Sequence, residues 1–448
     1  MSKNNEQAKK QKISTVRHTR AIQRDRSKRP AGAPADAQVV ARISEIVHPA
    51  TLAQVSHFQA LGLRARVLTL PVMMALVLSL LWQQTGSVNE LVRLIHQECI
   101  LWVPPLRDLS QQALATRLRM LPAALFLNVL LDILPVLNQR SLQRSRPLPA
   151  EVAWAKAHYQ QVLICDGSTL DALLRKVGLL QEAATNPLAG RMCALLDLVT
   201  HLPLQVWYEE NEQAHDQSFL PKVQASVAKG SLLLFDLGFT NFTFFRQLSE
   251  QGVFWITRAK SNLAFQVEQV LLKTAVVHDQ LVWIGQGEDR QLVRLIAFLY
   301  QGKWYRYLTN DCDPAHLPVE YAVALYWQRW RIEDGYAIVK RLLGLAFFHC
   351  GAQNAVQMQL WATWILYAVL VDLTDEVAHQ LNKPFARISL EMVYRSLPFF
   401  TRAHQRGEAN DLILFLADQA KELGILKAIR SDKPSRLRSL QLTMTQNP

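Results

Sequence analysis

Two short runs of aliphatic residues, each ending at an aspartate, constrain the fold of this chain most. Residues 161–165 (QVLIC) precede Asp166 and residues 231–235 (SLLLF) precede Asp236, and a glycine follows each aspartate within two positions. Continuous apolar runs of this length are typical of buried strands. A carboxylate at the carboxyl end of such a strand projects into the crevice where α/β sheets bind ligands. Taken singly, each aspartate also suits a helix N-cap or a turn.

Patterns of further strands and helices surround these two runs. Residues 191–200 and 203–209 are strand-like and are separated by a short turn, which predicts a β-hairpin. Helical periodicity follows at 213–228 and 243–251, and residues 253–258 (VFWITR) form another strand pattern. A hairpin followed by strands that alternate with helices predicts an α/β sheet of mixed direction.

The remaining patterns complete the expected domain organisation. Residues 262–308 contain several strand patterns, from FQVEQVLL to WYRYLTN, and predict a β-rich insertion within a core domain at 149–345. Helical periodicity at 39–148 predicts an N-terminal helical domain whose basic faces suit DNA binding. The periodicity at 346–428 predicts a helical C-terminal region.

Basic residues are concentrated at both ends of the chain. Residues 1–38 contain ten lysines and arginines and almost no apolar residues, so we expect a mobile tail that either binds phosphates or only aids solubility. Residues 429–448 are expected to form a second, disordered basic tail. The formal net charge of +12 indicates a polyanionic partner, which on charge alone is nucleic acid or an anionic membrane.

The cysteines and the apolar runs indicate the cellular compartment in which the protein is expected to act. Five scattered cysteines without CxxC spacing indicate a reducing, cytoplasmic environment and argue against structural zinc. The polar, basic N-terminus does not resemble a secretory signal. Apolar runs at 67–82 and 360–373 are shorter than the roughly 20 residues that cross a bilayer, so we expect buried helices and no membrane partner. The alternative of a membrane protein rests on these two runs alone.

Residues 321–345 (YAVALYWQRWRIEDGYAIVKRLLGL) predict one long helix with a polar stripe. Tyr326, Arg329, Glu333 and Lys340 point within an arc of roughly 60° at about 100° per residue. By spacing alone, the stripe is a solvated face stabilised by an i,i+4 pair of Arg329 with Glu333. The two aspartates that end strands favour a different interpretation.

Three carboxylates in this setting predict a metal site. Asp166, Asp236 and Glu333 have no Cys/His cluster nearby in sequence, and carboxylate oxygens suit Mg²⁺ or Mn²⁺ rather than zinc. Two such ions roughly 4 Å apart activate an attacking oxygen and stabilise a leaving one at phosphorus. Arg329, Lys340 and the phenol of Tyr326 lie on the same helix face and could bind the phosphates that flank the reacting one.

The stretch YWQRWRIEDGYAIVK carries Tyr-x2-Arg-x3-Glu-x6-Lys and resembles the signature of family four of the bacterial insertion-sequence DDE transposases. Asp166 in ICDGST and Asp236 in LLFDLGF resemble the family's first and second acidic blocks. The resemblance covers roughly residues 162–400. It implies an RNase H-like catalytic core with a β-rich insertion, and cut-and-paste DNA transposition.

The resemblance also implies roles, a cofactor and partners. The implied ligands of two Mg²⁺ or Mn²⁺ ions, and hence the implied catalytic residues, are Asp166, Asp236 and Glu333. The residues implied to bind DNA phosphates near the cleaved end are Tyr326, Arg329 and Lys340. The implied partners are the terminal inverted repeats of the element, target DNA, and a second copy of the chain in a dimer that pairs two ends.

Two further matches concern DNA contacts. Trp304 in GKWYRYLTN lies where hairpin-forming relatives place a tryptophan that stacks on a flipped base; Trp283 in LVWIG competes with it, and either also suits a plain core residue. Arg258 and Lys260 in WITRAK resemble basic residues that contact end DNA, with a solvated strand end as the alternative.

Two other functions use the same residues. A metal-dependent nuclease without strand transfer needs the same three carboxylates. A non-catalytic DNA-binding protein derived from a transposase is disfavoured because all three carboxylates are present.

Overall fold

The computed structural model describes residues 36–170, 190–211, 214–343, 345, 348–349, 352–428 and 436–446. Most of the tail expected at 1–38 therefore lies outside the described residues. The first described helix begins at Ala37, where Asp36 is its N-cap and accepts a hydrogen bond of 2.9 Å from the backbone N–H of Gln38.

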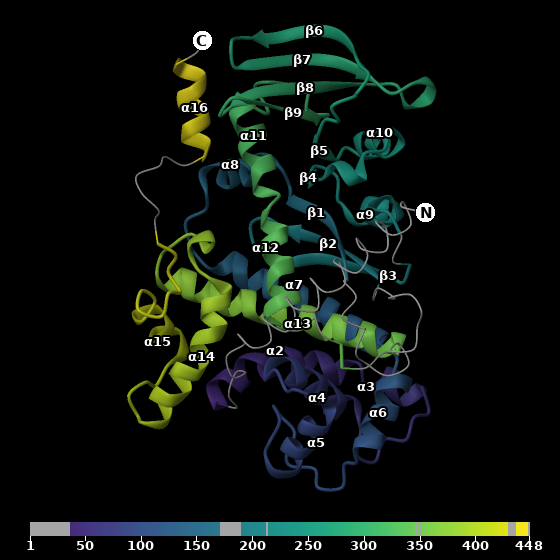
Figure 1. Ribbon diagram of the computed structural model, residues 1–448, viewed down its shortest axis with the longest axis vertical. Coiled ribbons are helices and arrows are strands. Elements are labelled where there is room, and N and C mark those ends of the chain that lie inside the picture. The colour runs from purple at the N-terminus through teal and green to yellow at the C-terminus, as the bar shows by residue number, and fades with distance from the viewer. Residues whose placement is uncertain are drawn as a thin grey trace, which may run out of the picture.

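A nine-stranded sheet of mixed direction forms the upper half of the molecule (Figure 1). Its order is β3-β2-β1-β4-β5-β9-β8-β7-β6, in which β1, β4 and β5 run parallel and all other neighbours pair antiparallel. The strands are β1 (Val162–Thr169), β2 (Arg191–Asp197), β3 (Pro203–Glu209), β4 (Leu232–Phe235), β5 (Phe254–Arg258), β6 (Gln266–Lys273), β7 (Val277–Ile284), β8 (Gln291–Tyr300) and β9 (Lys303–Thr309). The predicted mixed sheet, the β2–β3 hairpin and the strands at 262–308 are confirmed.

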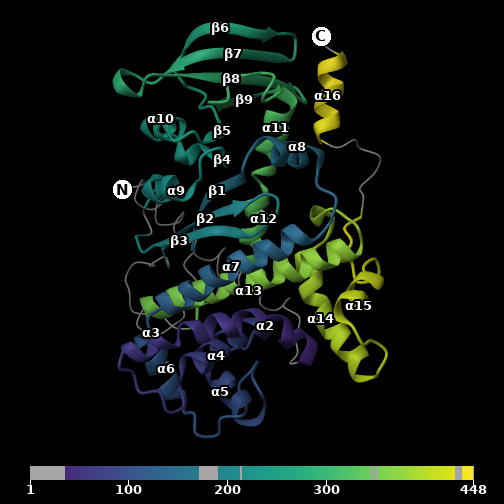
Figure 2. The same cartoon turned by 180° about the vertical axis from the view of Figure 1, so that it is seen from behind.

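The strands at 262–308 extend the same sheet. Strand β9 pairs with β5, so β6–β9 continue beyond the parallel strands without a gap in the hydrogen bonding. Strand β6 is the outermost strand, as Figure 2 shows from behind, and its side chains are largely exposed.

Helices of the N-terminal region lie at the far end of the molecule from β6 (Figure 1). Leu70 to Trp82 form a helix whose side chains are almost all buried, as the apolar run predicted. These helices are α2 (Ala37–Ala53), α3 (Val55–Ala60), α4 (Leu70–Trp82), α5 (Val88–Gln97) and α6 (Gln111–Met120). Helix α7 (Ala124–Gln143) lies in the middle of the molecule, and α8 (Ala150–His158) packs against β1 of the sheet.

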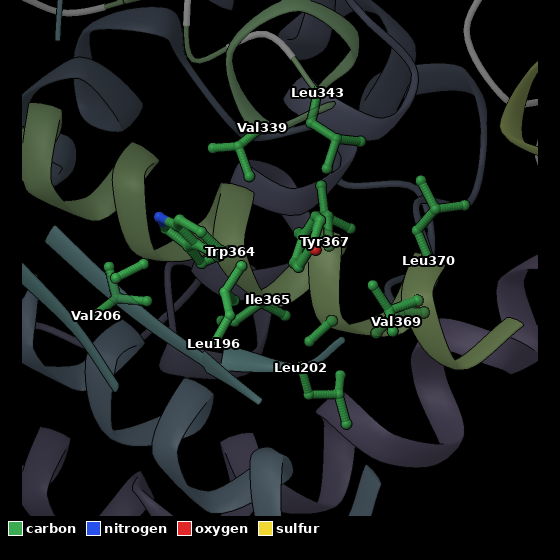
Figure 3. Packing of buried hydrophobic residues seen from close by; sticks show 14 of the residues in the cluster. Leu196, Leu202, Val206, Val339, Leu343, Trp364, Ile365, Tyr367, Val369 and Leu370 are labelled. Carbon is green, nitrogen blue, oxygen red and sulfur yellow. The ribbon is translucent and has the colours of Figure 1, made fainter. Parts of the chain in front are cut away.

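Helix α13 (Gln353–Gln380) crosses the centre of the molecule and packs against α7. Its Trp364 and Tyr367 belong to one apolar cluster with Leu196 of β2 and Val339 below the sheet (Figure 3). Among the described residues, α13 alone is long and apolar enough to cross a membrane, unless α6 and α7, which meet at 74°, are counted as one broken span. Because 94% of its most apolar stretch is buried within the molecule, α13 is a core helix, as the run at 360–373 predicted.

The remaining helices include one correction. Residues 436–446 were expected to belong to a disordered tail, but they form helix α16, in which Leu437 and Leu440 are buried against the rest of the molecule. Apolar side chains on one face of a short basic segment are enough to dock it. The other helical elements are η3 (Asp216–Phe219), α9 (Leu220–Ser226), η4 (Leu237–Phe239), α10 (Phe242–Glu250), η5 (Gly287–Asp289), α11 (Val319–Gln328), α12 (Arg331–Ala337), η6 (Ile338–Leu342), η7 (Phe385–Arg387), α14 (Leu390–Gln405), α15 (Leu412–Asp418) and α16 (Arg436–Gln446).

The helix predicted over 213–228 also differs. Residues 212 and 213 lie outside the described residues, and the segment begins with the 3₁₀ turn η3 before one short α-helix, α9. Pro221 in the first turn of α9 has no backbone N–H to donate, which suits a helix that starts at Leu220.

A candidate active site at the ends of the parallel strands

The parallel strands bring three predicted site residues to one edge of the sheet. Cys165 of β1 pairs with Phe235 of β4, which pairs with Thr257 of β5. The next residues, Asp166, Asp236 and Arg258, therefore follow at the same level on adjacent strands.

Asp166 does not end its strand, contrary to prediction. Strand β1 continues to Thr169 because its other neighbour, β2, keeps pairing with it, with Asp166 opposite Ala194. The parallel pairing with β4 stops at Cys165, so Asp166 has no strand partner on the side that faces β4. Only the β2 side of the edge is extended.

The prediction of a single helix at 321–345 is also wrong. Helix α11 ends at Gln328, α12 begins at Arg331, and a π-helical turn, η6, follows at Ile338–Leu342. The backbone N–H of Arg329 bonds to Tyr326 O at 3.1 Å, an i−3 contact that tightens the chain at the break. The break places Arg329 between the two helices, where its side chain turns into the site.

The Arg329 guanidinium joins all three predicted metal ligands. Its Nη1 lies 3.1 Å from Asp166 Oδ2, and its Nη2 lies 3.8 Å from Asp236 Oδ1 and 3.6 Å from Glu333 Oε1. The Arg329 side chain is only 6% exposed, whereas those of Asp236 and Glu333 are about half-exposed. The predicted pair of Arg329 with Glu333 is thus part of a larger network.

Burial and charge shift the acidity of these groups. Burial raises the pKa of the Asp166 carboxyl to about 7; Arg329 opposes that rise, and the negative charges of Asp236 and Asp216 add to it. Burial also raises the pKa of Glu333, again opposed by Arg329. Burial lowers the pKa of Arg329, but Tyr326 and the carboxylates raise it overall, so the guanidinium stays charged.

The structure separates the other members of the predicted polar stripe. Tyr326 is buried, and its ring lies 5.9 Å from the Arg329 Cζ atom and 4.9 Å from the ring of Tyr307. Lys340 lies in the π-helical turn, where its Nζ donates a hydrogen bond of 2.6 Å to Thr169 O at the end of β1. The four side chains therefore converge on the strand ends instead of forming a solvated stripe.

The predicted DNA-contact residues lie at or just after the end of β5 and on strands β7 and β9. Arg258 and Lys260 are exposed, and the Arg258 Cζ lies 5.9 Å from the Tyr305 ring of β9. Trp304 of β9 is 45% exposed and its ring centroid lies 4.7 Å from that of His278. Trp283 is held by Arg290 above its ring, at 4.7 Å, and by a hydrogen bond of 2.9 Å to Glu268.

Two residues of this site were missed by sequence reasoning. Trp330 stands at the break between α11 and α12 with 56% of its surface exposed, and the Arg329 Cζ lies 5.2 Å from its ring. Asp216 lies between the backbone segments that carry Asp166 and Asp236. Trp330 is adjacent to Arg329 in the signature, but nothing in the sequence marks it as exposed, and Asp216 has no pattern of its own.

The donor set suits a hard divalent cation. As they stand, no three His, Cys, Asp or Glu side chains in the described part of the chain are grouped closely enough to hold one ion. The carboxylates nevertheless converge on a cation, because the Arg329 guanidinium lies between them. Oxygen ligands with no sulfur or imidazole fit Mg²⁺ or Mn²⁺ once that guanidinium is displaced.

Part of this chain is similar to known transposases. Residues 182–369 match the model of a family described as transposase DDE domain, a span that includes Asp236 and Glu333 and begins after Asp166. The candidate transposase y4zB of Sinorhizobium fredii is 30% identical over 186 residues, which are 38% of this chain and 50% of that protein. The probable transposase for insertion sequence element IS5377 of Geobacillus stearothermophilus is 27% identical over 148 residues, 31% of this chain and 38% of that protein.

These matches support a DDE-type insertion-sequence transposase. They favour this function over a nuclease or a non-catalytic DNA-binding protein. The matches span half or less of each of the two relatives.

Among solved structures, this chain is similar to a piggyBac transposase synaptic complex with hairpin DNA. The alignment covers 90% of this chain and 85% of that one, at 11% identity and a TM-score of 0.39.

Proposed function

We propose that this chain is a DNA transposase of insertion-sequence family four, which cleaves the ends of its element and joins the 3′-hydroxyl ends to target DNA. The observation that supports the proposal is the convergence of Asp166, Asp236 and Glu333 on one buried cation at the ends of parallel strands. The order β3-β2-β1-β4-β5, extended by β9-β8-β7-β6, supports the proposed RNase H-like core with a β-rich insertion.

In this proposal the three carboxylates hold two Mg²⁺ or Mn²⁺ ions. Bound ions of this kind activate the attacking oxygen and stabilise the leaving oxygen in phosphodiester hydrolysis and transesterification. The positions of Asp166 and Asp236 are fixed because strands β1 and β4 are each hydrogen-bonded to neighbours on both sides. Glu333 instead lies in the first turn of α12, just after the interruption of the helix at Arg329. The rigid strands set the site and the helix completes it.

The basic and aromatic residues around the carboxylates suit the DNA. We propose that Arg329 leaves the carboxylates and binds a phosphate near the cleaved end, because a planar guanidinium exchanges one oxyanion partner for another. The other proposed phosphate contacts are Tyr326, Lys340, Arg258 and Lys260. We propose that Trp304 stacks on an unpaired base of the end.

The proposed partners are the terminal inverted repeats, target DNA and a second copy of the chain. The chain's net charge of +12 suits a duplex, and two ends need two active sites. We propose that the protein acts in the cytoplasm on nucleoid DNA. The domains proposed for end recognition are the helices at 39–148 and the basic tail before them.

The test uses DNA that carries the inverted repeats flanking the gene. Asp166→Asn, Asp236→Asn and Glu333→Gln should each lose strand cleavage in Mg²⁺ while binding the ends like wild type. Asp334→Asn is the matched control, because Asp334 directly follows Glu333 but is 73% exposed and pairs with Arg331 at 3.5 Å instead of with Arg329.

A second arm separates transposition from simple hydrolysis. Wild-type protein given pre-cleaved ends and a target plasmid should yield joined product. Cleavage of the ends without joining to the plasmid would instead support the alternative function, a nuclease without strand transfer. Wild-type-like cleavage by any of the three carboxylate variants would overturn the assignment of the active site.

A further inference from the structure

A fourth carboxylate, that of Asp216, lies between the two segments that carry the proposed metal ligands. Gly167 follows Asp166, and Gly238 lies two residues after Asp236. A Cβ atom on Gly167 would overlap Asp216 Oδ1 and lie 2.9 Å from its Cγ, and one on Gly238 would overlap Oδ2 and lie 3.3 Å from Cγ. One carboxylate therefore lies directly against both backbones.

The absence of a side chain at these two positions is explained by the nearby Asp216 carboxylate and not by the backbone conformation. Neither has a positive φ, so an L side chain is not excluded by strain at either position. The space that a side chain needs is instead filled by Asp216. Each glycine allows its strand end to approach the same carboxylate.

Arg191 holds the Asp216 carboxylate in this position. Its Nη2 lies 2.5 Å from Asp216 Oδ1, and its Nη1 donates a hydrogen bond of 3.0 Å to Ala214 O in the segment that leads into η3. Arg191 opens β2 and pairs in register with Thr169 at the end of β1. The side chains of the pair are about four-fifths buried. Through these contacts the pair connects β1, β2 and the segment before α9.

We propose that Asp216, held by Arg191, is a positioning residue that fixes the separation of Asp166 and Asp236 for metal binding. The inference rests on the proposed function, since it assigns Asp216 a role toward the same two ligands. Two metal-ligand carboxylates must be held within about 0.5 Å of the productive geometry, and packed neighbours supply that precision. The carboxylate of Asp216 also adds negative charge beside Asp166, which favours a bound cation.

The experiment measures Mn²⁺ binding and DNA binding by the full-length protein. Asp216→Ala should weaken Mn²⁺ binding, followed by electron paramagnetic resonance, by about 10- to 100-fold, the range typical of residues that orient metal ligands. The Mg²⁺ concentration for half-maximal cleavage should rise in parallel, while end binding in a mobility-shift assay stays within about twofold. Asp216→Asn keeps the shape but loses the charge and should fall between wild type and Asp216→Ala.

Two further variants keep the proposal falsifiable. Gly167→Ala should reproduce the loss of Mn²⁺ binding, because the new Cβ displaces the Asp216 carboxylate. Asp289→Asn is the matched control: Asp289 also pairs with an arginine, Arg246, at 3.1 Å, but away from the site. It should bind Mn²⁺ like wild type.

The outcomes distinguish the two proposals. If Asp166→Asn loses Mn²⁺ binding and cleavage while both Asp216 variants and Gly167→Ala match wild type, the positioning role is wrong and the proposed function stands. If Asp166→Asn also matches wild type, the proposed function itself fails. Should Asp216→Ala not fold, as judged by its melting temperature, the comparison of Asp216→Asn with Asp289→Asn decides.

Discussion

Nη1 of Arg329 lies 3.1 Å from Oδ2 of Asp166, inside the site where divalent ions are proposed to bind. The guanidinium is almost fully buried and faces two further carboxylates. A cation supplied by the chain itself offsets part of the repulsion among three acidic groups. Metal ions bound at the proposed site would therefore compete with Arg329 for the same oxygens.

This competition predicts the behaviour of Arg329→Gln in the absence of DNA. Mn²⁺ should bind the variant about tenfold more tightly than wild type, because no charged hydrogen bond, worth about 1.5–3 kcal/mol, has to be broken first. Isothermal titration with Mn²⁺ measures the change. Arg331→Gln is the control, since Arg331 pairs with Asp334 instead. Equal affinities for wild type and Arg329→Gln would contradict the competition.

Arg329 also has a predicted effect on DNA binding. If it binds one phosphate, Arg329→Ala should make the slope of log K against log salt shallower by about 0.9 on duplex ends. Binding is measured by fluorescence anisotropy between low and moderate salt. Arg406→Ala, at an exposed pair with Glu408 in the C-terminal region, should leave the slope unchanged. An unaltered slope in Arg329→Ala would remove its phosphate role.

The raised pKa of Asp166 predicts a pH-dependent stability in the metal-free protein. A carboxyl whose pKa rises from 3.8 to about 7 on folding stabilises the native state below pH 3.8, and that contribution is lost as the pH rises to about 7. Asp166→Asn stays neutral, so its free energy of unfolding relative to wild type should increase between pH 5 and 8, by at most about 3 kcal/mol. Melting temperatures in EDTA test this, and parallel curves for the two proteins would refute it.

Trp304 has a predicted role that Trp283 should not share. Stacking on a base is worth about 1–3 kcal/mol, so Trp304→Ala should weaken binding to a pre-nicked end by about 5- to 150-fold. Trp283→Ala should have little effect, because Arg290 covers that ring. A fluorescent 2-aminopurine placed in turn at the terminal positions reports the stacked base. Equal losses in both variants would point to a structural role for the β-rich insertion.

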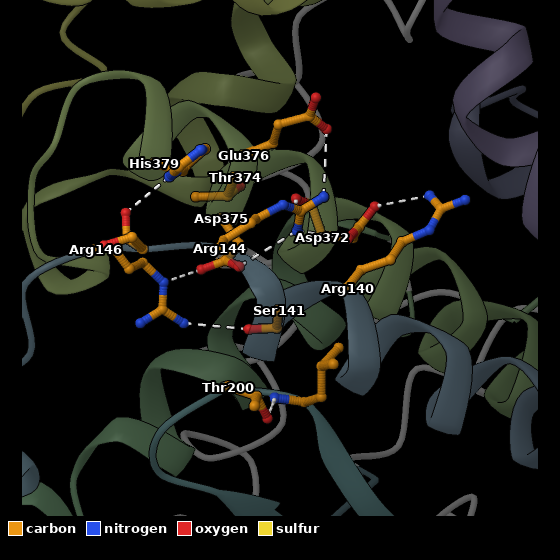
Figure 4. A network of polar contacts seen from close by, with 12 residues as sticks. Arg140, Ser141, Arg144, Arg146, Thr200, Asp372, Thr374, Asp375, Glu376 and His379 are labelled. Atoms are coloured by element: carbon orange, nitrogen blue, oxygen red, sulfur yellow. Dashed lines mark hydrogen bonds and ion pairs between the residues drawn. The ribbon is translucent and has the colours of Figure 1, made fainter.

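A buried ionic network joins α7 and α13, as Figure 4 shows. Asp375 is 1% exposed and pairs with Arg146 and, at 3.3 Å, with Arg144. Asp375→Ala should destabilise the protein by about 3–5 kcal/mol, because it leaves buried arginine charge uncompensated. The melting temperature should fall clearly, whereas Glu408→Ala, at the exposed pair with Arg406, should not change it.

The sequence by itself determined the strands of the sheet and marked the three carboxylates of the candidate site. Continuous apolar runs specify buried strands, so β1, β4 and β5 and the strands at 262–308 followed from local patterns. Asp166, Asp236 and Glu333 were marked by their position after strands or within a spaced signature. Such signals depend on residues that are neighbours in the chain.

Tertiary structure decided how those elements meet. The helical hydrogen bonding is interrupted at Arg329, where periodicity alone would continue it, and the guanidinium lies beside Asp166, 163 residues away in sequence. Asp216 lies against two strand ends from a segment predicted to be helical. Docking of α16 likewise depends on a distant apolar surface. Contacts between residues far apart in sequence carry no local periodicity, which is why only the folded chain shows them.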